Sequence, residues 1–282
     1  MIPSEHGGAA YALREEQISM LRELKLFLFD LDGTLYLGER LFPFTPALLR
    51  EIRGRGGRYL FMTNNSSRSV KDYAARLCRL GIAAQEADFV TSSQAAVYYL
   101  NRYCAAATLY VCGTRSLKEE LMRAGFGVTE KPEEAEGILM GFDTELTFQK
   151  LRDISYLLCT RDLPYFATNP DYVCPTEFGS VPDCGSVCEM LYRATGKRPV
   201  VLGKPEPIMP QLAMERVGCA PQQTAVIGDR LYTDIRCGIC AGVRTVLVMS
   251  GETTPEMLES SADKPDVVLQ SGAQLLKALR LA

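Results

Sequence analysis

The chain has 282 residues, of which 47% are hydrophobic and 23% charged, with a formal net charge of −3. These values are typical of a globular protein with one large or two modest domains, and the negative charge disfavours binding to nucleic acid or to an anionic membrane surface. Because no apolar run is long enough to span a bilayer and residues 1–8 lack the pattern of a secretory signal, we expect a cytoplasmic protein.

Predicted helices and strands alternate along the first third of the chain. An amphipathic, charged segment at 11–24 predicts a helix, and the apolar run after it predicts a strand that ends at Asp30 and is buried on both faces. A loop is expected through Pro43. The pattern then predicts helices at 45–53 and 70–80, a further helix that runs through 100, and strands at 58–62 and 89–91.

A second α/β pattern runs from about residue 105 to 196. Strands are predicted at 108–112, 137–142 and 164–167, and helices at 117–124, at 148–159 and, after a loop at 177–186, through 195. The remaining residues predict strands at 200–202, 225–227, 245–249 and 266–269, and helices at 208–217 and between 234 and 242. The alternation predicts an α/β fold in which helices cover both faces of a parallel sheet.

Four of the predicted strands end in polar residues that suit a binding site. In chain order these residues are Asp30 with Asp32, Thr63 with Asn64, Lys204, and Asp229 with Asp234. Each set has a structural alternative: a solvated turn, a common loop, a plain turn and a helix cap, respectively. Ligands of open α/β sheets bind at the carboxyl ends of the strands, so the repeated placement favours one site.

Asp30 and Asp32 form the most informative of these sets. If Asp32 stays extended, the two-residue period of a strand points both carboxylates the same way. Two converging acids suit a divalent cation, or a nucleophile beside a general acid/base.

Cysteine and histidine usage limits the chemistry. Most of the ten cysteines lie inside apolar segments, as is typical of reduced, buried thiols. Cys237 and Cys240 have the spacing of half a zinc site, but without a second half we expect them to pack in a helix. The only histidine is His6, close to the N-terminus, so histidine-dependent catalysis and histidine-bound zinc are not expected.

The four polar sets, in this order, resemble the motifs of the haloacid dehalogenase superfamily of phosphohydrolases. The match consists of Asp30-Leu-Asp-Gly-Thr34, Thr63, Lys204, and Gly228-Asp229 with Asp234. Segments 63–68, 167–171, 203–207 and 228–235 narrow the resemblance to the NagD-like, p-nitrophenylphosphatase branch. The resemblance covers nearly everything from Leu26 onward. It implies a Rossmann-like core at 1–94 and 201–282, and an α/β cap inserted at 95–200.

The resemblance also implies a mechanism. Asp30 would be the nucleophile that forms an aspartyl-phosphate, and Asp32 would act as general acid and then as general base. Mg²⁺ would be held by Asp30, the backbone carbonyl of Asp32, and Asp229. Asp234 would orient the metal-bound waters or Lys204.

Further residues would bind the substrate. Thr63 and Lys204 would contact the phosphoryl oxygens, together with backbone N–H groups from 31 to 34, where Gly33 permits close approach. Asn64 would position Asp32 or the leaving group. Asn65 and Thr34 are also expected to bind the phosphate or the substrate.

The cap would supply specificity by covering the site. Two segments are candidates for substrate contact. The first is 168–171, although a strand-to-loop turn would account for its polar residues nearly as well. The second is the loop before the last cap helix, although a helix N-terminus would account for its residues. The residues expected to contact the substrate from that loop are Asp183, Cys184, Gly185 and Ser186.

The leading interpretation is a Mg²⁺-dependent phosphatase of small phosphomonoesters, such as phosphosugars, phosphoglycolate, glycerol phosphate, pyridoxal phosphate or nucleoside monophosphates. Asp32 argues against a dehalogenase, because a halide leaving group needs no proton. A phosphosugar mutase and a non-catalytic phosphoryl-ligand binder on the same fold remain alternatives. The expected partner is a small phosphorylated metabolite, with a possible homodimer through the cap.

Overall fold

The computed structural model describes residues 11–104, 108–176 and 178–281, and the chain divides into two compact units. The first unit comprises Met1–Thr63, Ala74–Val90 and Pro205–Ala282, and the second comprises Asn64–Tyr73 and Thr91–Lys204. Each unit is described by itself. His6 lies outside the described residues.

The limits of the units resemble the domain boundaries predicted from the sequence. The predicted boundaries follow residues 94 and 200, and the corresponding unit limits follow Val90 and Lys204. The main difference is the segment Asn64–Tyr73, which belongs to the second compact unit. The assignment of core and cap domains stays a prediction.

The first unit is built around a six-stranded sheet with the order β15-β14-β13-β1-β4-β5. In that order its strands are Val267–Leu269, Arg244–Val248, Thr224–Gly228, Leu26–Phe29, Arg58–Thr63 and Phe89–Thr91. β1 pairs in parallel with β13 and with β4, and all its residues are buried. This burial is typical of a parallel strand that is covered on both faces.

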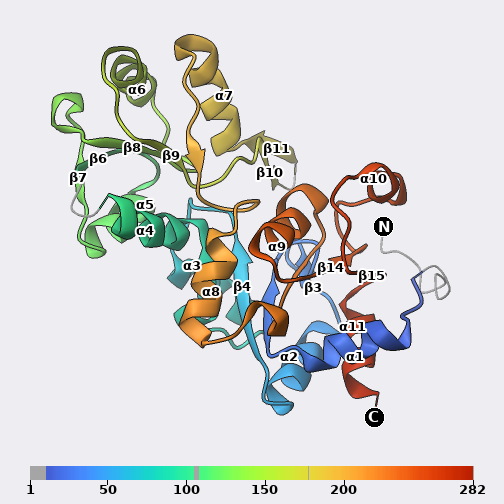
Figure 1. Ribbon diagram of the computed structural model, residues 1–282. Coiled ribbons are helices and arrows are strands. Elements are labelled where there is room, and N and C mark those ends of the chain that lie inside the picture. Colours follow the sequence, from blue (N-terminus) through green and yellow to red (C-terminus); the bar gives the residue numbers. More distant parts are fainter. Residues whose placement is uncertain (1–10, 105–107, 177, 282) are drawn as a thin grey trace. The chain divides into compact units, whose positions relative to one another are not determined.

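Helices cover both faces of the first sheet (Figure 1). They are α1 (Glu15–Glu23), α2 (Thr45–Gly54), α8 (Ile208–Val217), α9 (Arg236–Ala241), α10 (Pro255–Ser260) and α11 (Gly272–Arg280). A side chain at Gly57 would touch Ile52 of α2 and Phe27 of β1, whereas one at Gly238 of α9 would touch Val226 of β13. Phe27 and Val226 point to opposite faces, so α2 and α9 cover opposite faces.

The second unit contains a five-stranded, all-parallel sheet with the order β12-β9-β8-β6-β7. In that order its strands are Val200–Val201, Tyr165–Ala167, Gly137–Met140, Thr108–Cys112 and Gly127–Thr129. Its helices are α4 (Ser92–Tyr103), α5 (Arg115–Arg123), α6 (Phe148–Thr160) and α7 (Cys184–Thr195). The predicted α/β class with parallel sheets is thus confirmed.

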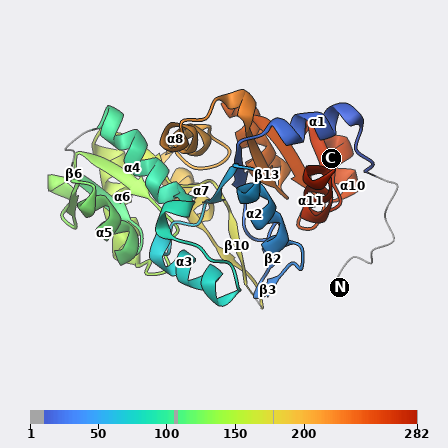
Figure 2. The same ribbon diagram turned by 90° about the horizontal axis from the view of Figure 1, so that it is seen from below.

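The helices of the second unit also lie on two faces (Figures 1 and 2). Ile154 of α6 and Leu191 of α7 share one buried cluster with Tyr110 and Met140 of the sheet. On α4, the ring of Tyr99 lies 5.7 Å from that of Phe166, a strand residue outside this cluster.

Two short hairpins form where the sequence predicts no strand. β2 (Tyr36–Leu37) pairs with β3 (Arg40–Leu41), and β10 (Val173–Thr176) pairs with β11 (Gly179–Pro182). Their strands are short and mostly exposed, so they lack the buried apolar run by which a strand is recognised. The sequence pattern also gives no prediction of β7, α10 or α11.

The ten cysteines are all free, as expected for reduced thiols. Only four are buried, namely Cys112, Cys184, Cys188 and Cys237. The expectation that most of them are buried is wrong, because several occupy exposed helix positions. Cys240 is one of these, and it lies with Cys237 in α9 as predicted.

Among the described residues, no helix combines the length and the apolar character needed to cross a membrane. The cytoplasmic location stays a prediction.

Candidate active site

The carboxyl edge of the first sheet brings two predicted acids together. Phe29, the last residue of β1, is aligned with Ile227 of β13, and the N–H of Asp30 donates to the Ile227 carbonyl at 2.8 Å. Asp30 and Asp229 therefore follow neighbouring strands at the same edge. Thr63, which ends β4, is buried on the other side of β1.

Asp234 joins these two acids. One carboxylate oxygen from each of Asp30, Asp229 and Asp234 lies within 4.8 Å of the others. Asp234 stands in a single π-helical turn, Leu231–Ile235, a form that often marks functional sites. A Cβ at Gly228 would lie 2.3 Å from the Asp234 carboxyl carbon, so glycine is needed there for Asp234 to pack against β13.

Asp229 is almost completely buried, with 3% of its surface exposed. Its Oδ2 accepts the N–H of Glu252 at 2.7 Å, whereas its buried Oδ1 has no partner among the described residues. Burial, and the negative charges of Asp30 and Asp234, raise the pKa of Asp229 to about 8. A divalent cation would stabilise the ionised form of a buried carboxyl that has an unused lone pair and two acidic neighbours.

Two glycines allow the backbone to approach Asp229. A Cβ at Gly33 would lie 2.5 Å from Asp229 Oδ2, and one at Gly251 would lie 1.9 Å from it. Gly33 also has a φ of +78°, which other residues rarely adopt. The sequence pattern did not single out Gly251 and Glu252, although they follow β14 just as the motif residues follow β1 and β13.

Asp32 is not part of the three-acid cluster. It is exposed, forms an isolated bridge with Tyr36, and accepts a hydrogen bond from the N–H of Gly38. Partial desolvation raises the pKa of the Asp32 carboxyl above its usual value, although the Gly38 bond and the Arg76 and Arg230 guanidinium groups oppose the shift. The two acids of the first motif therefore have different surroundings.

Thr34 is another predicted residue that remains unsatisfied within the first unit. It is buried, and its Oγ1 has no hydrogen-bond partner among the described residues. Like Asp229 Oδ1, this atom is free to contact a ligand.

In the second unit, Asn64 holds the backbone of Lys204. The N–H of Lys204 donates to Asn64 Oδ1 at 2.8 Å, and Asn64 Nδ2 donates to the Lys204 carbonyl at 2.9 Å. Lys204 is buried, with 3% exposed. The same Nδ2 donates to Asp171 at 2.8 Å, and Asn65 Nδ2 contacts the sulfur of Cys174 at 3.9 Å. Asn64 thus fixes the predicted lysine.

The segment 168–171 belongs to a hydrogen-bonded network. Thr168 donates to Asn169 Oδ1 at 2.9 Å, and Asn169 Nδ2 donates to Asp171 at 2.9 Å and to Asp183 at 3.1 Å. Ser66 Oγ lies 2.9 Å from Thr168 Oγ1. These contacts order the strand-to-loop turn from within.

The four predicted cap residues have structural contacts of their own. Asp183 is the N-cap of α7 and accepts from the N–H of Cys184. Ser186 Oγ donates to the Tyr172 carbonyl at 2.5 Å, and a Cβ at Gly185 would lie 2.1 Å from the Pro170 carbonyl oxygen. These contacts are those of a helix N-terminus, which was the alternative explanation of this loop. Substrate contact by the four residues stays a prediction.

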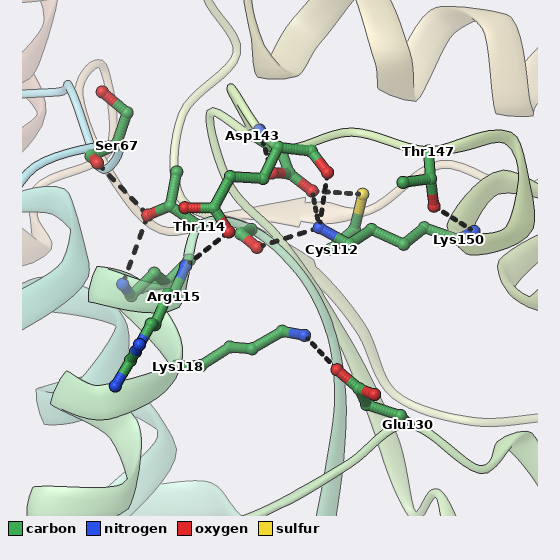
Figure 3. A network of polar contacts seen from close by, with 12 residues as sticks. Ser67, Cys112, Thr114, Arg115, Lys118, Glu130, Asp143, Thr147 and Lys150 are labelled. Atoms are coloured by element: carbon green, nitrogen blue, oxygen red, sulfur yellow. Dashed lines mark hydrogen bonds and ion pairs between the residues drawn. The ribbon is translucent and has the colours of Figure 1, made fainter.

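A further polar network supports the loops of the same sheet (Figure 3). Lys150 donates to Asp143 at 2.7 Å and to the Gly113 carbonyl at 3.3 Å. Thr114 Oγ1 donates to the Ser67 carbonyl at 3.2 Å. The segment after β4 is thus bonded to the β6–α5 loop.

Comparison with known proteins settles the family. Residues 27–127 match a model described as haloacid dehalogenase-like hydrolase, and residues 201–275 match one described as HAD-hydrolase-like. The chain is 34% identical over 251 residues to the 5′-nucleotidase YutF of Bacillus subtilis, covering 89% of this chain and 97% of that protein. The chain belongs to the haloacid dehalogenase-like hydrolases.

Solved structures place it within that family. A 4-nitrophenylphosphatase from Thermotoga maritima is 34% identical with a TM-score of 0.88, over 93% of this chain and 99% of that one. A glycerol phosphate phosphatase from Mycobacterium tuberculosis, in complex with magnesium, is 30% identical with a TM-score of 0.84, over 92% of this chain and 77% of that one. The predicted resemblance to NagD-like phosphatases is confirmed, and with it the class of phosphoric monoester hydrolase.

Proposed function

We propose that the chain is a Mg²⁺-dependent phosphatase that hydrolyses small phosphomonoesters through an aspartyl-phosphate on Asp30. The observation that carries this proposal is the cluster of Asp30, Asp229 and Asp234, in which a buried Asp229 oxygen has no partner among the described residues. Three acids held this closely repel one another unless a cation or protons compensate them.

The donor set fits magnesium. Mg²⁺ prefers oxygen ligands and is usually held by one or two carboxylates while it keeps several waters. Asp30, Asp229 and the backbone carbonyl of Asp32 would hold it, and Asp234 would orient its waters or Lys204. When bound, the cation offsets the repulsion between the anionic nucleophile and the phosphate dianion.

Asp30 and Asp32 would divide the chemistry. The Asp30 carboxylate attacks phosphorus, the bond from phosphorus to the leaving oxygen breaks, and Asp32 donates a proton to that oxygen. Water then attacks the phosphorus of the aspartyl-phosphate, Asp32 accepts its proton, and inorganic phosphate leaves Asp30. Asp32 supports this role, because its carboxyl is exposed and lies outside the three-acid cluster, where it can exchange protons with the leaving group and with water.

The phosphoryl oxygens would be bound by Thr63, Lys204 and the backbone N–H groups from 31 to 34. Lys204 would act as a point charge, and its backbone is already fixed by Asn64. Gly33 supports the backbone cradle, because a side chain there would occupy the space beside Asp229. Thr34 supports it with an unsatisfied, buried hydroxyl.

The substrate belongs to the class on which the named relatives act, which includes nucleotides and glycerol phosphate. The choice among phosphomonoesters would come from the second unit, including Asn65 and the residues that start α7. The proposed homodimer through the cap is tested separately, by light scattering.

The experiment is phosphate release from 4-nitrophenyl phosphate with Mg²⁺, with EDTA, and with Asp30→Asn. Asp162→Asn is the matched control, because Asp162 is fully exposed and far from the motifs in sequence. Release that requires Mg²⁺ and Asp30 but not Asp162 supports the proposal. If wild type releases no phosphate, so that it is indistinguishable from Asp30→Asn and from the sample with EDTA, the proposal fails in favour of a non-catalytic phosphoryl-ligand binder.

A further inference from the structure

The β2–β3 hairpin is attached to the first motif at both ends. At its base, the N–H of Gly33 donates to the Tyr36 carbonyl at 2.7 Å, and Asp32 forms a bridge with Tyr36. At its tip, the N–H of Gly38 donates to the Asp32 carboxylate. The position of Asp32 therefore depends on where this tip lies.

The tip is held by a side chain from outside the hairpin. Arg76 of α3 (Val70–Arg79) donates to the Gly38 carbonyl at 3.0 Å and pairs with Glu39 at 3.1 Å. Its guanidinium carbon also lies 4.9 Å from the centre of the Tyr36 ring. Figure 2 shows α3 next to this hairpin. One guanidinium thus contacts three of the hairpin's residues.

Gly38 connects Arg76 to Asp32 through a single residue. Its carbonyl accepts from Arg76, and its N–H donates to Asp32. Gly38 has a φ of +59°, and a Cβ added to it would meet no atom within 4 Å, so its own packing does not fix it. An exposed ion pair alone contributes little, but a planar guanidinium with three contacts restrains geometry.

We propose that Arg76 is a positioning residue for Asp32: it fixes the hairpin tip so that the Asp32 carboxyl is aimed at the leaving oxygen of the substrate. This inference rests on the proposed function of Asp32. A general acid must be within hydrogen-bond reach of the oxygen that it protonates. Loss of Arg76 should therefore matter most for leaving groups that need a proton.

The test compares kcat/KM for a good and a poor leaving group. 4-Nitrophenyl phosphate releases a phenolate that needs little protonation, whereas glycerol phosphate releases an alcohol that needs it. We expect Arg76→Met to lower kcat/KM for glycerol phosphate about tenfold more than for 4-nitrophenyl phosphate, a part of the roughly 10²–10⁴-fold that general acids contribute. Because kcat/KM covers only the steps through phosphoryl transfer to the enzyme, a slow second step does not hide this effect.

Three further variants make the result specific. Arg76→Lys keeps the charge and one contact, so it should recover part of the selectivity. Arg79→Met removes an exposed arginine of the same helix and should leave kcat/KM unchanged for both substrates. Asp32→Asn should show the same selective loss as Arg76→Met, only larger. A thermal melt of each variant reports any loss of folding.

The outcomes separate the inference from the proposed function. The inference is overturned if Asp32→Asn lowers kcat/KM mainly for glycerol phosphate while Arg76→Met lowers kcat/KM equally for both substrates. Arg76 would then have a merely structural role. If Asp32→Asn itself shows no selectivity, the general-acid role fails and the inference fails with it. If Arg76→Met does not fold, the ratio for Arg76→Lys decides in the same way.

Discussion

The carboxyl edges of the two parallel sheets carry similar residues in opposite states. At the edge of the six-stranded sheet, Asp30, Asp229 and Asp234 crowd together, and Asp229 keeps an unsatisfied oxygen. At the edge of the five-stranded sheet, Asn169 joins Asp171 and Asp183 through hydrogen bonds, and Asp183 also caps α7. In the same architecture, the acids at the first edge repel one another, whereas the polar groups at the second edge are hydrogen-bonded.

This difference indicates what each edge is for. A buried polar group without a partner destabilises the fold, so it persists where a ligand completes it. A satisfied polar network instead fixes one conformation of the chain. We therefore expect acid removal at the first edge to affect activity rather than folding, and polar-group removal at the second to affect folding.

The largest effect is expected from Asp30→Asn. Removing the nucleophile should lower kcat by at least roughly 10³-fold, as for nucleophiles of other hydrolases. The melting temperature in EDTA should not fall, since the substitution removes one of the acids that repel one another in the cluster. The measurement is steady-state phosphate release together with a thermal melt. If Asp30→Asn retained activity but had a lower melting temperature, the acids at the first edge would serve folding rather than activity.

Asp229→Asn should abolish the response to magnesium. In the wild-type protein, Mg²⁺ should raise the melting temperature, because a ligand that binds only the native state stabilises it. The variant should show little such rise and little activity. Differential scanning calorimetry with Mg²⁺ and with EDTA measures this, and Asp162→Asn should respond like wild type. An unchanged Mg²⁺ shift in Asp229→Asn would remove Asp229 from the proposed metal site.

The acid cluster illustrates what the sequence could predict. Asp30 and Asp229 follow long apolar runs, and two adjacent parallel strands must end at one edge, so their proximity follows from the pattern. Gly251 and Glu252 were missed because an acid in the loop after a strand does not reveal that its backbone N–H, rather than its side chain, contacts the site. Their role lies in backbone contacts to Asp229, which any sequence with a glycine there could make.

Arg76 and the hairpins show a second limit. A two-residue strand has no periodicity, so β2 and β3 read as a loop, and the contact of Arg76 with Gly38 spans 38 residues. Asp183 was assigned to the substrate because it lies in a predicted cap loop at the N-terminus of a helix, which could receive a polar group of the substrate. The helix-cap contact is local and matches the alternative that the sequence offered, whereas the bond from Asn169 joins residues 14 positions apart, which no local pattern encodes.

Asn169→Ala should destabilise the second edge. It leaves Asp183, which is 5% exposed, without one of its donors, and loss of a buried partner costs about 1–3 kcal/mol. The melting temperature should therefore fall in EDTA, whereas that of Asp229→Asn should not. Asn101→Ala, an exposed position on α4, is the matched control. Equal melting temperatures for Asn169→Ala and Asn101→Ala would show that this network does not stabilise the fold.

A gradual pH dependence is also expected, and it belongs to the first edge alone. The pKa of Asp229 is raised from 3.8 to about 8 by burial and by Asp30 and Asp234, so the native protein retains a proton that the unfolded chain loses. Between these pH values, stability from this group falls as pH rises, by at most about 1.4 kcal/mol per pH unit.

Asp229→Asn removes this titration. In EDTA, the melting temperature of the variant minus that of wild type should therefore increase as the pH rises from about 5 to about 8. Asn169→Ala keeps all three acids, so its difference from wild type should stay constant over the same range. Mg²⁺ should reverse the trend for wild type only, because a cation stabilises the ionised cluster and binds better as its protons leave. A difference between Asp229→Asn and wild type that is flat with pH would mean that Asp229 is ionised in the native protein without a cation. The first edge would then be satisfied in the same way as the second.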